Sequence, residues 1–335
     1  MVGIGIVGTG YWGKNHVTIY KSLLLEKKID YLKICDIDEE RVKEISEINS
    51  IDYTTNIKEL LNDDKITAVG IITPSSTHYE LSKLSLESGK DVFVEKPITL
   101  KSDNAMKLID LAKQKRKILM VGHLFRYHPA VEEIKKRIDL GEFGKIQMIL
   151  SFRLALGVPQ KDMGVVLALA VHDLDLTCYL LNKKEPESIL VDNGKFNQKV
   201  VTEITNISLN FDNNTKGYIM DSWNIPVYGK RRELLIIGSE KSGYVNYLTP
   251  SEYQIFDSSI RNRKFNDKVI FEKHNNGIHK IVIEYKEPLK QEILHFIKCI
   301  ETRTAPNSDG LVGYNAVRMC EKAILSAEKN ERIYF

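Results

Sequence analysis

The first 121 residues alternate short apolar runs with longer amphipathic stretches. Runs rich in β-branched and other apolar residues occupy positions 2–7, 32–35, 68–72, 91–94 and 118–121. Between them, apolar residues recur at helical spacing, as in residues 79–87 and 104–115. Strands that alternate with helices are typical of βαβ units and a mainly parallel sheet. The nearly continuous apolar strands favour a sheet that is covered on both faces.

The pattern changes after residue 121. Helical spacing predicts helices at residues 129–140, 165–181, 289–300 and 311–329. Alternation of apolar and polar residues predicts strands at 203–211, 217–223, 233–237, 253–256 and 280–285. Strands joined by turns favour a mostly antiparallel sheet. The polar residues 206–214 and 262–276 are expected to form loops or hairpin tips.

We therefore predict an α/β protein with two domains. Residues 1–121 are expected to form an N-terminal Rossmann domain with a doubly wound parallel sheet, which would bind NAD. Residues 122–335 are expected to form a C-terminal α+β domain on an open, mainly antiparallel sheet, for substrate binding and oligomerisation. Two domains also agree with the length of 335 residues.

Composition excludes several classes of protein. With 48 basic and 45 acidic residues the net charge is +3, which argues against a protein that grips nucleic acid or an anionic membrane. Hydrophobic residues at 43% and charged residues at 28% are ordinary for a folded protein. No uncharged apolar run approaches the roughly 18 residues of a membrane span, and the first residues do not resemble a secretory signal.

Cysteine and histidine spacing gives no sign of a metal site. The four cysteines are far apart and form no Cys-x-x-Cys pair: Cys35, Cys178, Cys299 and Cys320. We therefore predict no bound metal. A reducing cytoplasm is the expected location.

A glycine-rich segment follows the first predicted strand and opens a helix. It matches the dinucleotide-binding pattern G-x-G-x-x-G, and its six residues are the first candidate cofactor ligands: Gly8, Thr9, Gly10, Tyr11, Trp12 and Gly13. In this pattern the first glycine permits a tight turn, the second allows close approach of the pyrophosphate, and the third lets the helix pack on the strand. The helix N-terminus then attracts the phosphates. The alternative is a glycine-rich turn without a ligand.

Asp36 ends the second predicted strand, 23 residues after Gly13. A carboxylate at this position accepts hydrogen bonds from the adenosine ribose and repels a 2′-phosphate. No basic residue follows before Arg41, so we predict NAD rather than NADP. The alternative is a helix N-cap, a role that Asp38 fits better because Glu39 and Glu40 follow it.

Two further segments resemble motifs of the glucose-fructose oxidoreductase / inositol dehydrogenase / rhizopine-catabolism (Gfo/Idh/MocA) family. Residues 71–78 are similar to its T-P-x-x-x-H element, and residues 94–97 to its E-K-P motif. Residues 121–131 and 171–175 resemble the family's exit from the nucleotide domain and its H-D-x-D helix. The resemblance implies further cofactor-binding residues at Thr73, Pro74, Ser75, His78, Glu95 and Lys96.

Lys96 would face both nicotinamide and substrate. Its motif falls at the carboxyl end of a strand, where open α/β sheets bind ligands. An ammonium there can hydrogen-bond the reacting hydroxyl and stabilise a developing alkoxide. The family often has a cis bond before the motif's proline, so Lys96–Pro97 is a candidate. Without the motif, a surface lysine would be the expected interpretation.

The resemblance implies that His172 is the general base that takes the hydroxyl proton. The alternative is a core histidine on an apolar helix. Asp173 and Asp175 are interpreted as solvent-facing or capping charges. The family usually carries Asp four residues before this histidine, but this chain has Ala168. The missing carboxylate does not remove hydride transfer, because that chemistry belongs to the cofactor. Its loss can lower the rate, change the substrate, or mark a chain that binds without turnover.

Two arginines are candidates for holding a carboxylate or phosphate of the substrate: Arg126 at the domain junction and Arg153 on a strand. Each could instead be a structural ion-pair partner. The predicted reaction moves a hydride between NAD and a secondary alcohol of a sugar, cyclitol or nucleotide-sugar, with Lys96 and His172 also touching substrate. A UDP-sugar or sugar acid is the first expectation, partly because of Arg153. The resemblance also implies a homodimer or homotetramer.

Two alternatives remain at this stage. One is a non-catalytic sensor of NAD or sugar with the same fold, which Ala168 would explain. The other is a family enzyme with a different NAD-assisted reaction, in which NAD is recycled rather than consumed.

Overall fold

The structure is a computed structural model that describes residues 2–159, 163–197, 199–226, 229–265 and 268–335. The chain forms two compact units. The first combines the segment ending at Leu124 with Glu287–Arg318, and the second combines Phe125–Lys286 with Met319–Phe335. Each unit is built on one sheet.

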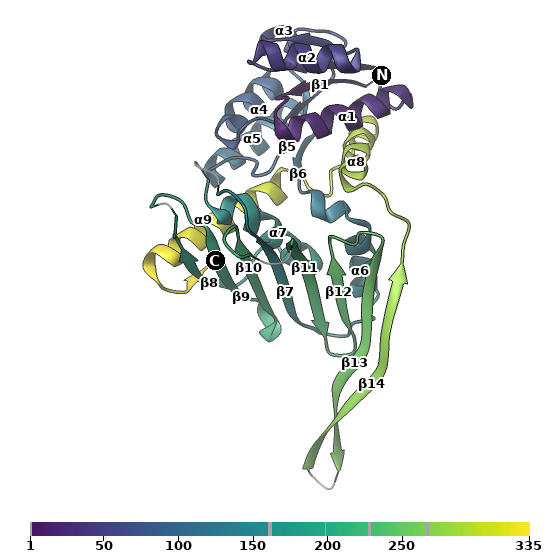
Figure 1. The fold of residues 1–335 in the computed structure, drawn as a ribbon, viewed down its shortest axis with the longest axis vertical. Helices are drawn as coiled ribbons and strands as arrows, with labels where there is room; N and C mark the ends of the chain where they lie inside the picture. Colours follow the sequence, from purple (N-terminus) through teal and green to yellow (C-terminus); the bar gives the residue numbers. More distant parts are fainter. Residues whose placement is uncertain (1, 160–162, 198, 227–228, 266–267) are drawn as a thin grey trace. The chain divides into compact units, whose positions relative to one another are not determined.

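The first unit contains the predicted parallel sheet (Figure 1). Its order is β3-β2-β1-β4-β5-β6, and every described pair in it is parallel. Sheet order reverses direction beside β1, as in doubly wound folds. The strands are β1 (Gly3–Val7), β2 (Tyr31–Cys35), β3 (Asp52–Thr54), β4 (Ala68–Ile71), β5 (Asp91–Glu95) and β6 (Leu119–Gly122).

Helices connect these strands and bury apolar side chains against the sheet. Val69 and Val92 from the strands share a core with Leu86 and Leu108 from helices, all fully buried. The helical segments are α1 (Tyr11–Leu25), α2 (Glu39–Asn49), α3 (Ile57–Leu61), η1 (Ser75–Thr77), α4 (His78–Glu87) and α5 (Ser102–Lys115).

The chain returns to the first unit near its C-terminus, through α8 (Pro288–Thr302) and the first part of α9 (Gly310–Lys329). Phe296 of α8 is fully buried, with its ring 5.7 Å from that of Phe93 on β5. Arg303 donates two hydrogen bonds to Asp91, at 2.8 and 2.9 Å. The predicted domain boundary at residue 121 assigns α8 to the second domain. In the structure, the apolar face of α8 completes the core of the first unit instead.

The second unit contains a nine-stranded sheet in the order β14-β13-β12-β11-β7-β10-β9-β8-β15. Only β7 and β10 run parallel among its described pairs, so the sheet is mainly antiparallel as expected. The strands are β7 (Ile146–Ala155), β8 (Ser188–Gly194), β9 (Ile204–Asn210), β10 (Lys216–Ser222), β11 (Lys230–Gly238), β12 (Ser242–Asn246), β13 (Glu252–Phe265), β14 (Lys268–Val282) and β15 (Ile333–Tyr334).

Helices cover one face of this second sheet. Ala130 and Ile134 from α6 share a core with Leu176 from α7 and Ile236 from β11. The helical segments are η2 (Leu124–Tyr127), α6 (Pro129–Asp139), η3 (Val166–Ala170), α7 (Val171–Leu180) and η4 (Asp212–Asn214), with the end of α9 beside them. No helix in the described ranges is long and apolar enough to cross a membrane.

The helix predicted at residues 165–181 is present but changes pitch. Residues of η3 form a π-helical turn, and the amide of Val171 reaches the carbonyl of Val166, five residues earlier. π-turns within helices are rare and frequent at functional sites. This turn lies immediately before His172.

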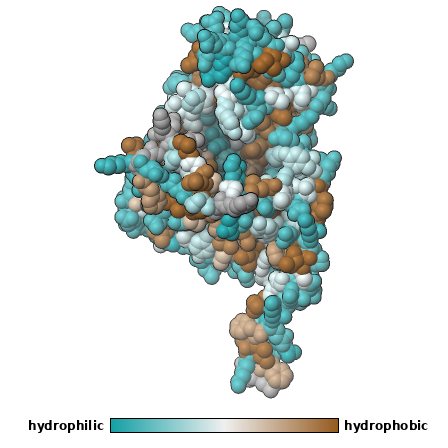
Figure 2. Space-filling view, viewed as in Figure 1, coloured by the Kyte–Doolittle hydropathy of each residue, from teal (hydrophilic) through white to brown (hydrophobic). Residues whose placement is uncertain are grey.

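The expectation of loops or hairpin tips at residues 262–276 is correct only in part. These residues belong to a hairpin, but β13 and β14 pair along this region in a long two-stranded ribbon (Figure 1). Both faces of the ribbon are exposed, so its strands carry many polar and charged residues and lack the usual apolar alternation. Figure 2 shows hydrophobic residues among hydrophilic ones along it. The expectation of a loop at 206–214 also fails in part, because β9 extends to Asn210.

Replacement of Phe296 by alanine tests whether α8 belongs to the core of the first unit. The lost ring should leave a cavity and destabilise the protein by about 3–5 kcal/mol. Phe271→Ala on the exposed ribbon is the matched control, since that ring is 69% exposed, and it should change stability by about 0.5 kcal/mol or less. Chemical denaturation of both variants measures the difference, and equal effects would contradict the packing.

Candidate active site in two halves

The glycine-rich turn has the geometry that a dinucleotide requires. Gly8 has φ +98°, and a Cβ there would lie 2.3 Å from the carbonyl oxygen of Ile72. A Cβ on Gly13 would lie 2.2 Å from the carbonyl oxygen of Gly8. A Cβ on Gly10 would meet nothing within 4 Å. Two glycines therefore close the turn, and the third leaves open space at the N-terminus of α1, where a pyrophosphate fits.

Asp36 lies directly after β2 and is buried. Its Oδ2 accepts the backbone N–H and the hydroxyl of Thr9, at 2.7 and 2.9 Å. Its Oδ1 accepts the N–H of Asp38 at 3.1 Å and Nη2 of Arg41 at 3.0 Å. Burial opposes ionisation, but these bonds together hold the pKa of Asp36 below its ordinary value. Asp36 is therefore a fixed carboxylate that also anchors the glycine-rich turn.

The alternative of a helix cap at Asp36 is resolved in favour of Asp38. The Asp38 side chain accepts the N–H of Arg41 and caps α2. The sequence identifies Arg41 only as the next basic residue along the chain, yet its guanidinium lies against both carboxylates, 3.0 Å from Asp36 and 3.3 Å from Asp38. Its spacing of five residues from Asp36, across the first turn of a helix, was the available signal.

Glu95 ends β5 and links α1 to the residue that follows the strand. Its Oε1 accepts Nε1–H of Trp12 at 2.7 Å and lies 2.9 Å from Nε2 of His16. Its Oε2 accepts the backbone N–H of Lys96 at 3.1 Å. Burial opposes ionisation, but the His16 contact and the other bonds hold the pKa of Glu95 below its ordinary range. This carboxylate ties the glycine-rich turn to Lys96, and sequence reasoning missed its partner His16.

His78 has an internal role of the same kind. Its ring nitrogens face two backbone carbonyls, that of Pro97 at 2.8 Å and that of Thr73 at 2.9 Å. Burial lowers the pKa of His78, partly offset by these carbonyls. The ring bridges the two loops that follow β4 and β5. The Lys96–Pro97 bond is cis, as expected.

The remaining predicted cofactor residues of this unit differ in exposure. Tyr11 is 92% exposed, and Pro74 is also exposed. Thr73 and Ser75 are half-buried around η1, and Thr73 pairs with the hydroxyl of Thr77. Lys96 is half-buried beside the strand end. Lys96, Gly10 and the loop after β4 therefore offer surface to a ligand, while Thr9, Glu95 and His78 hold that surface in place.

The second unit presents His172 on the first turn of α7. The ring is half-buried and meets the ring of Phe125 edge-on, with 5.0 Å between centroids. Ala168 is buried in the π-turn before it. Lys96 and His172 thus belong to different units, each held by its own surroundings.

The interpretation of Asp173 and Asp175 as solvent-facing charges is wrong. Asp173 accepts Nε–H of Arg153 and the hydroxyl of Ser151, both at 2.5 Å. Asp175 accepts two hydrogen bonds from Arg126, at 2.9 and 2.5 Å. All these groups are buried or nearly so. Both aspartates of the H-D-x-D helix are thus bound by arginines, Asp173 by Arg153 of β7 and Asp175 by Arg126 of η2.

For Arg126 and Arg153 the geometry favours the ion-pair alternative over substrate binding. Arg126 also stacks on Tyr179, 4.7 Å from the ring centroid. Arg153 is 4% exposed and lies 3.8 Å from the ring centroid of Phe125. The expectation of an acidic substrate loses the support that it took from Arg153. No cluster of metal-ligating side chains occurs among the residues that the structure describes.

Comparison with known proteins shows the family to which the chain belongs. The family model described as "Oxidoreductase family, NAD-binding Rossmann fold" matches residues 2–123, and the "GFO/IDH/MocA C-terminal domain" matches residues 131–243. The chain therefore belongs to the Gfo/Idh/MocA family of NAD-binding oxidoreductases.

Three similar proteins illustrate the family. The scyllo-inositol 2-dehydrogenase (NAD(+)) of Bacillus subtilis is 27% identical over 91% of this chain and 86% of its own. The structure of levoglucosan dehydrogenase with NADH and levoglucosan has a TM-score of 0.84 at 20% identity, covering 99% of both chains. The structure of UDP-N-acetylglucosamine 3-dehydrogenase from Acidithiobacillus ferrooxidans has a TM-score of 0.80 at 22% identity, covering 98% of this chain and 99% of that one. The two structures show the shared fold.

Replacement of Asp36 by alanine should weaken NADH binding by about 10- to 100-fold, the effect of losing charge-assisted hydrogen bonds worth about 1.5–3 kcal/mol. It should also narrow the preference over NADPH, because the variant loses the carboxylate that would repel a 2′-phosphate. Fluorescence titration with both nucleotides measures the ratio. Asp38→Ala is the control, expected to lower stability by about 1 kcal/mol without changing the ratio. An unchanged ratio in Asp36→Ala would reject the ribose role.

Proposed function

We propose that the protein is an NAD-dependent dehydrogenase that transfers a hydride between the nicotinamide and a secondary alcohol of a sugar, cyclitol or nucleotide-sugar. The observation that carries this proposal is the linkage at the end of β5. There Glu95 binds Trp12 of the glycine-rich turn and the amide of Lys96. A single carboxylate thus fixes a lysine relative to the turn that would hold the pyrophosphate.

The chemistry divides between the two units. NAD, when bound, supplies the hydride acceptor. The Lys96 ammonium orients the reacting hydroxyl and stabilises negative charge on its oxygen. His172 takes or returns the hydroxyl proton, for which imidazole is suited near neutral pH. The names of the similar proteins, which concern inositol, levoglucosan and a UDP-sugar, support a polyhydroxylated substrate.

A second candidate is a sensor that binds NAD and a sugar without turnover. One observation favours it, namely that Ala168 fills the π-turn before His172 where the family's carboxylate is expected. An alanine can neither orient a substrate hydroxyl nor accept its hydrogen bond. The two candidates differ in whether the native chain reduces NAD.

The deciding experiment compares the native protein with Ala168→Asp. Each is given NAD and a panel of sugars, cyclitols and nucleotide-sugars, and nicotinamide absorbance is followed. Turnover by the native protein supports the dehydrogenase and identifies its substrate class. Turnover by the variant alone supports the sensor.

Replacement of Lys96 by methionine should abolish turnover with the substrate found in that panel. Methionine keeps much of the side-chain volume but lacks the ammonium, so NADH binding should stay within a few-fold of native. Stopped-flow hydride transfer and NADH titration separate the two effects. The exposed Lys101 provides a control through Lys101→Met. Full activity of Lys96→Met would remove this lysine from the mechanism.

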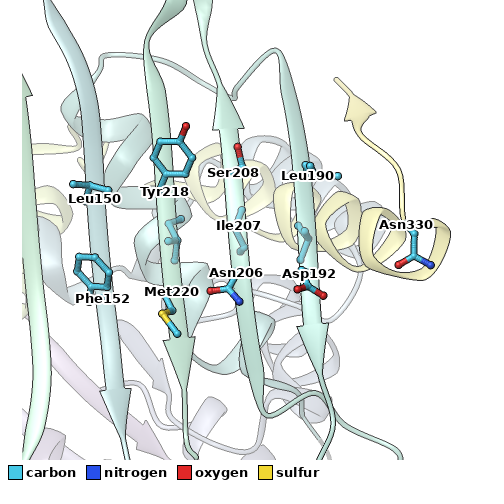
Figure 3. Close-up of a pocket in the computed structure, with 12 residues that line it drawn as sticks. Leu150, Phe152, Leu190, Asp192, Asn206, Ile207, Ser208, Tyr218, Met220 and Asn330 are labelled. Carbon is cyan, nitrogen blue, oxygen red and sulfur yellow. The ribbon is translucent and has the colours of Figure 1, made fainter. Parts of the chain in front are cut away.

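We also propose that the protein assembles as a homo-oligomer through the open face of its second sheet. Figure 3 shows Leu150 and Phe152 of β7 beside Tyr218 and Met220 of β10 on the face away from α9. These side chains line a shallow groove of about 500 Å³ together with Leu190 of β8. Exposed apolar patches of this kind typically mark interfaces.

The four free, buried cysteines fit a reducing compartment such as the cytoplasm.

The double substitution Tyr218→Glu with Leu190→Glu should shift the oligomer towards monomer, because both side chains are more than a third exposed on this face and buried unpaired charge is costly. Sedimentation velocity at micromolar concentration measures the change. Leu140→Glu, at the exposed end of α6, should leave assembly unchanged. A native protein that sediments as a monomer would contradict the proposal.

A further inference from the structure

Asp221 lies inside the second unit, on β10 beneath the helices. The strand register places it directly between Arg153 on β7 and Thr205 on β9. Asp221 and Thr205 are fully buried and Arg153 nearly so. Directly paired residues of neighbouring strands point to the same face of a sheet. These three side chains therefore share the face that also contacts α7 and η3.

This cluster contains two carboxyl groups and one guanidinium. Asp173 accepts hydrogen bonds from Nε–H of Arg153 and from the hydroxyl of Ser151. Within the described residues, both oxygens of Asp221 and Nη2 of Arg153 lack a hydrogen-bond partner of normal geometry. The Asp173 carboxyl and the backbone of Arg153 nevertheless lie near enough to the Asp221 carboxyl to affect its ionisation. A second buried carboxylate without its own cation would cost several kcal/mol. A neutral acid in that position avoids this cost and can donate a hydrogen bond.

The same arginine leads to His172. Its guanidinium lies 3.8 Å from the ring centroid of Phe125 and 5.3 Å from that of Tyr247. The Phe125 ring in turn meets the His172 ring edge-on at 5.0 Å. Asp173, the other partner of Arg153, is adjacent to His172 in the chain. Arg153 therefore contacts both the residue that follows His172 and the ring that packs against it.

We propose that Asp221 is a positioning residue for His172: as a neutral carboxylic acid it keeps its proton, directs its O–H as a hydrogen-bond donor towards the Asp173 carboxylate, and completes the buried group that holds Arg153, Phe125 and the first turn of α7. This assignment rests on the proposed role of His172 and adds a residue outside the family motifs. Asp221 acts through its neighbours and does not touch substrate.

The charges that face Asp221 come from two elements, Asp173 on α7 and Arg153 on β7, whereas the residues of η3 are all apolar. His128 and Tyr247 lie beyond Arg153. Burial, and after it the Asp173 charge, raises the pKa of Asp221 well above its ordinary value, and Arg153 offsets this only in part. At a pH between the ordinary carboxyl pKa and this raised pKa, Asp221 therefore carries a proton in the folded chain but not in the unfolded chain.

The sign of the pH dependence follows from that difference. Where the folded state binds one more proton, the unfolding equilibrium constant rises about tenfold per pH unit. The contribution of Asp221 to stability is therefore greatest at low pH, and it falls as the pH rises from the ordinary carboxyl range to the raised pKa. Above that pKa the loss is complete.

Asp221→Asn tests the proton directly, because a carboxamide matches the shape and donor capacity of the neutral acid. Chemical denaturation of the full chain is measured from pH 4 to pH 9. The native protein should become less stable as the pH rises, because Asp221 loses its proton, whereas the asparagine has no proton to lose. The free energy of unfolding of the variant minus that of the native protein should therefore increase with pH. Infrared difference spectra should also show a protonated-carboxyl band in the native protein that Asp221→Asn lacks. An identical pH dependence with no such band would overturn the proposal.

The positioning role is tested by NMR titration of the His172 ring. Asp221→Asn should leave the midpoint of that titration as in the native protein, whereas Asp221→Ala should shift it by about one pH unit or broaden its signals. If Asp221→Ala does not fold, Phe125→Leu interrupts the same contacts and should give the same shift. An unchanged midpoint in the folded variants would overturn the role. None of these readouts needs turnover, so they stand even if the panel of sugars identifies no substrate.

Discussion

A buried carboxylate is stable only when its oxygens are satisfied, and this constraint organises the candidate site residues of each unit. Ionised carboxylates lose several kcal/mol of hydration on burial unless hydrogen bonds or cations replace the water. Asp36 meets the requirement with four donors, and Glu95 with Trp12 and His16 of α1 and the backbone N–H of Lys96. Asp173 meets it with Ser151 and Arg153. Each carboxylate thereby fixes the backbone that carries a functional group.

The first unit could be predicted closely from sequence because its signals are local. A strand, the glycine-rich turn and a helix are consecutive in the chain, and steric rules alone require Gly8 and Gly13. What sequence could not show is which motif residues face the ligand. Glu95 and His78 stand in the motifs, yet their polar atoms bind Trp12, His16 and backbone carbonyls. A motif gives a residue's position along a strand end, but not the direction of its side chain.

The second unit was less predictable because its key pairs join distant strands. Arg153 and Asp221 are 68 residues apart in the chain, and only the parallel register of β7 and β10 brings them together. The sequence offered two open interpretations for Arg153, and the Asp173 partner decides between them geometrically. The ribbon of β13 and β14 was missed for a related reason. Exposure on both faces removes the alternation by which a strand is recognised.

The location of the Ala168 departure bears on which activity the chain has kept. In the first unit, the turn, Asp36, Glu95 and Lys96 have the geometry that the proposed NAD site requires. The change lies in the other unit, in the π-turn that precedes His172. His172 lies on α7, where its ring packs against Phe125 and two arginines bind the aspartates of the same helix. Since the proposed general base is held this firmly although Ala168 replaces the carboxylate, the departure is more simply explained by an altered substrate contact than by lost hydride chemistry.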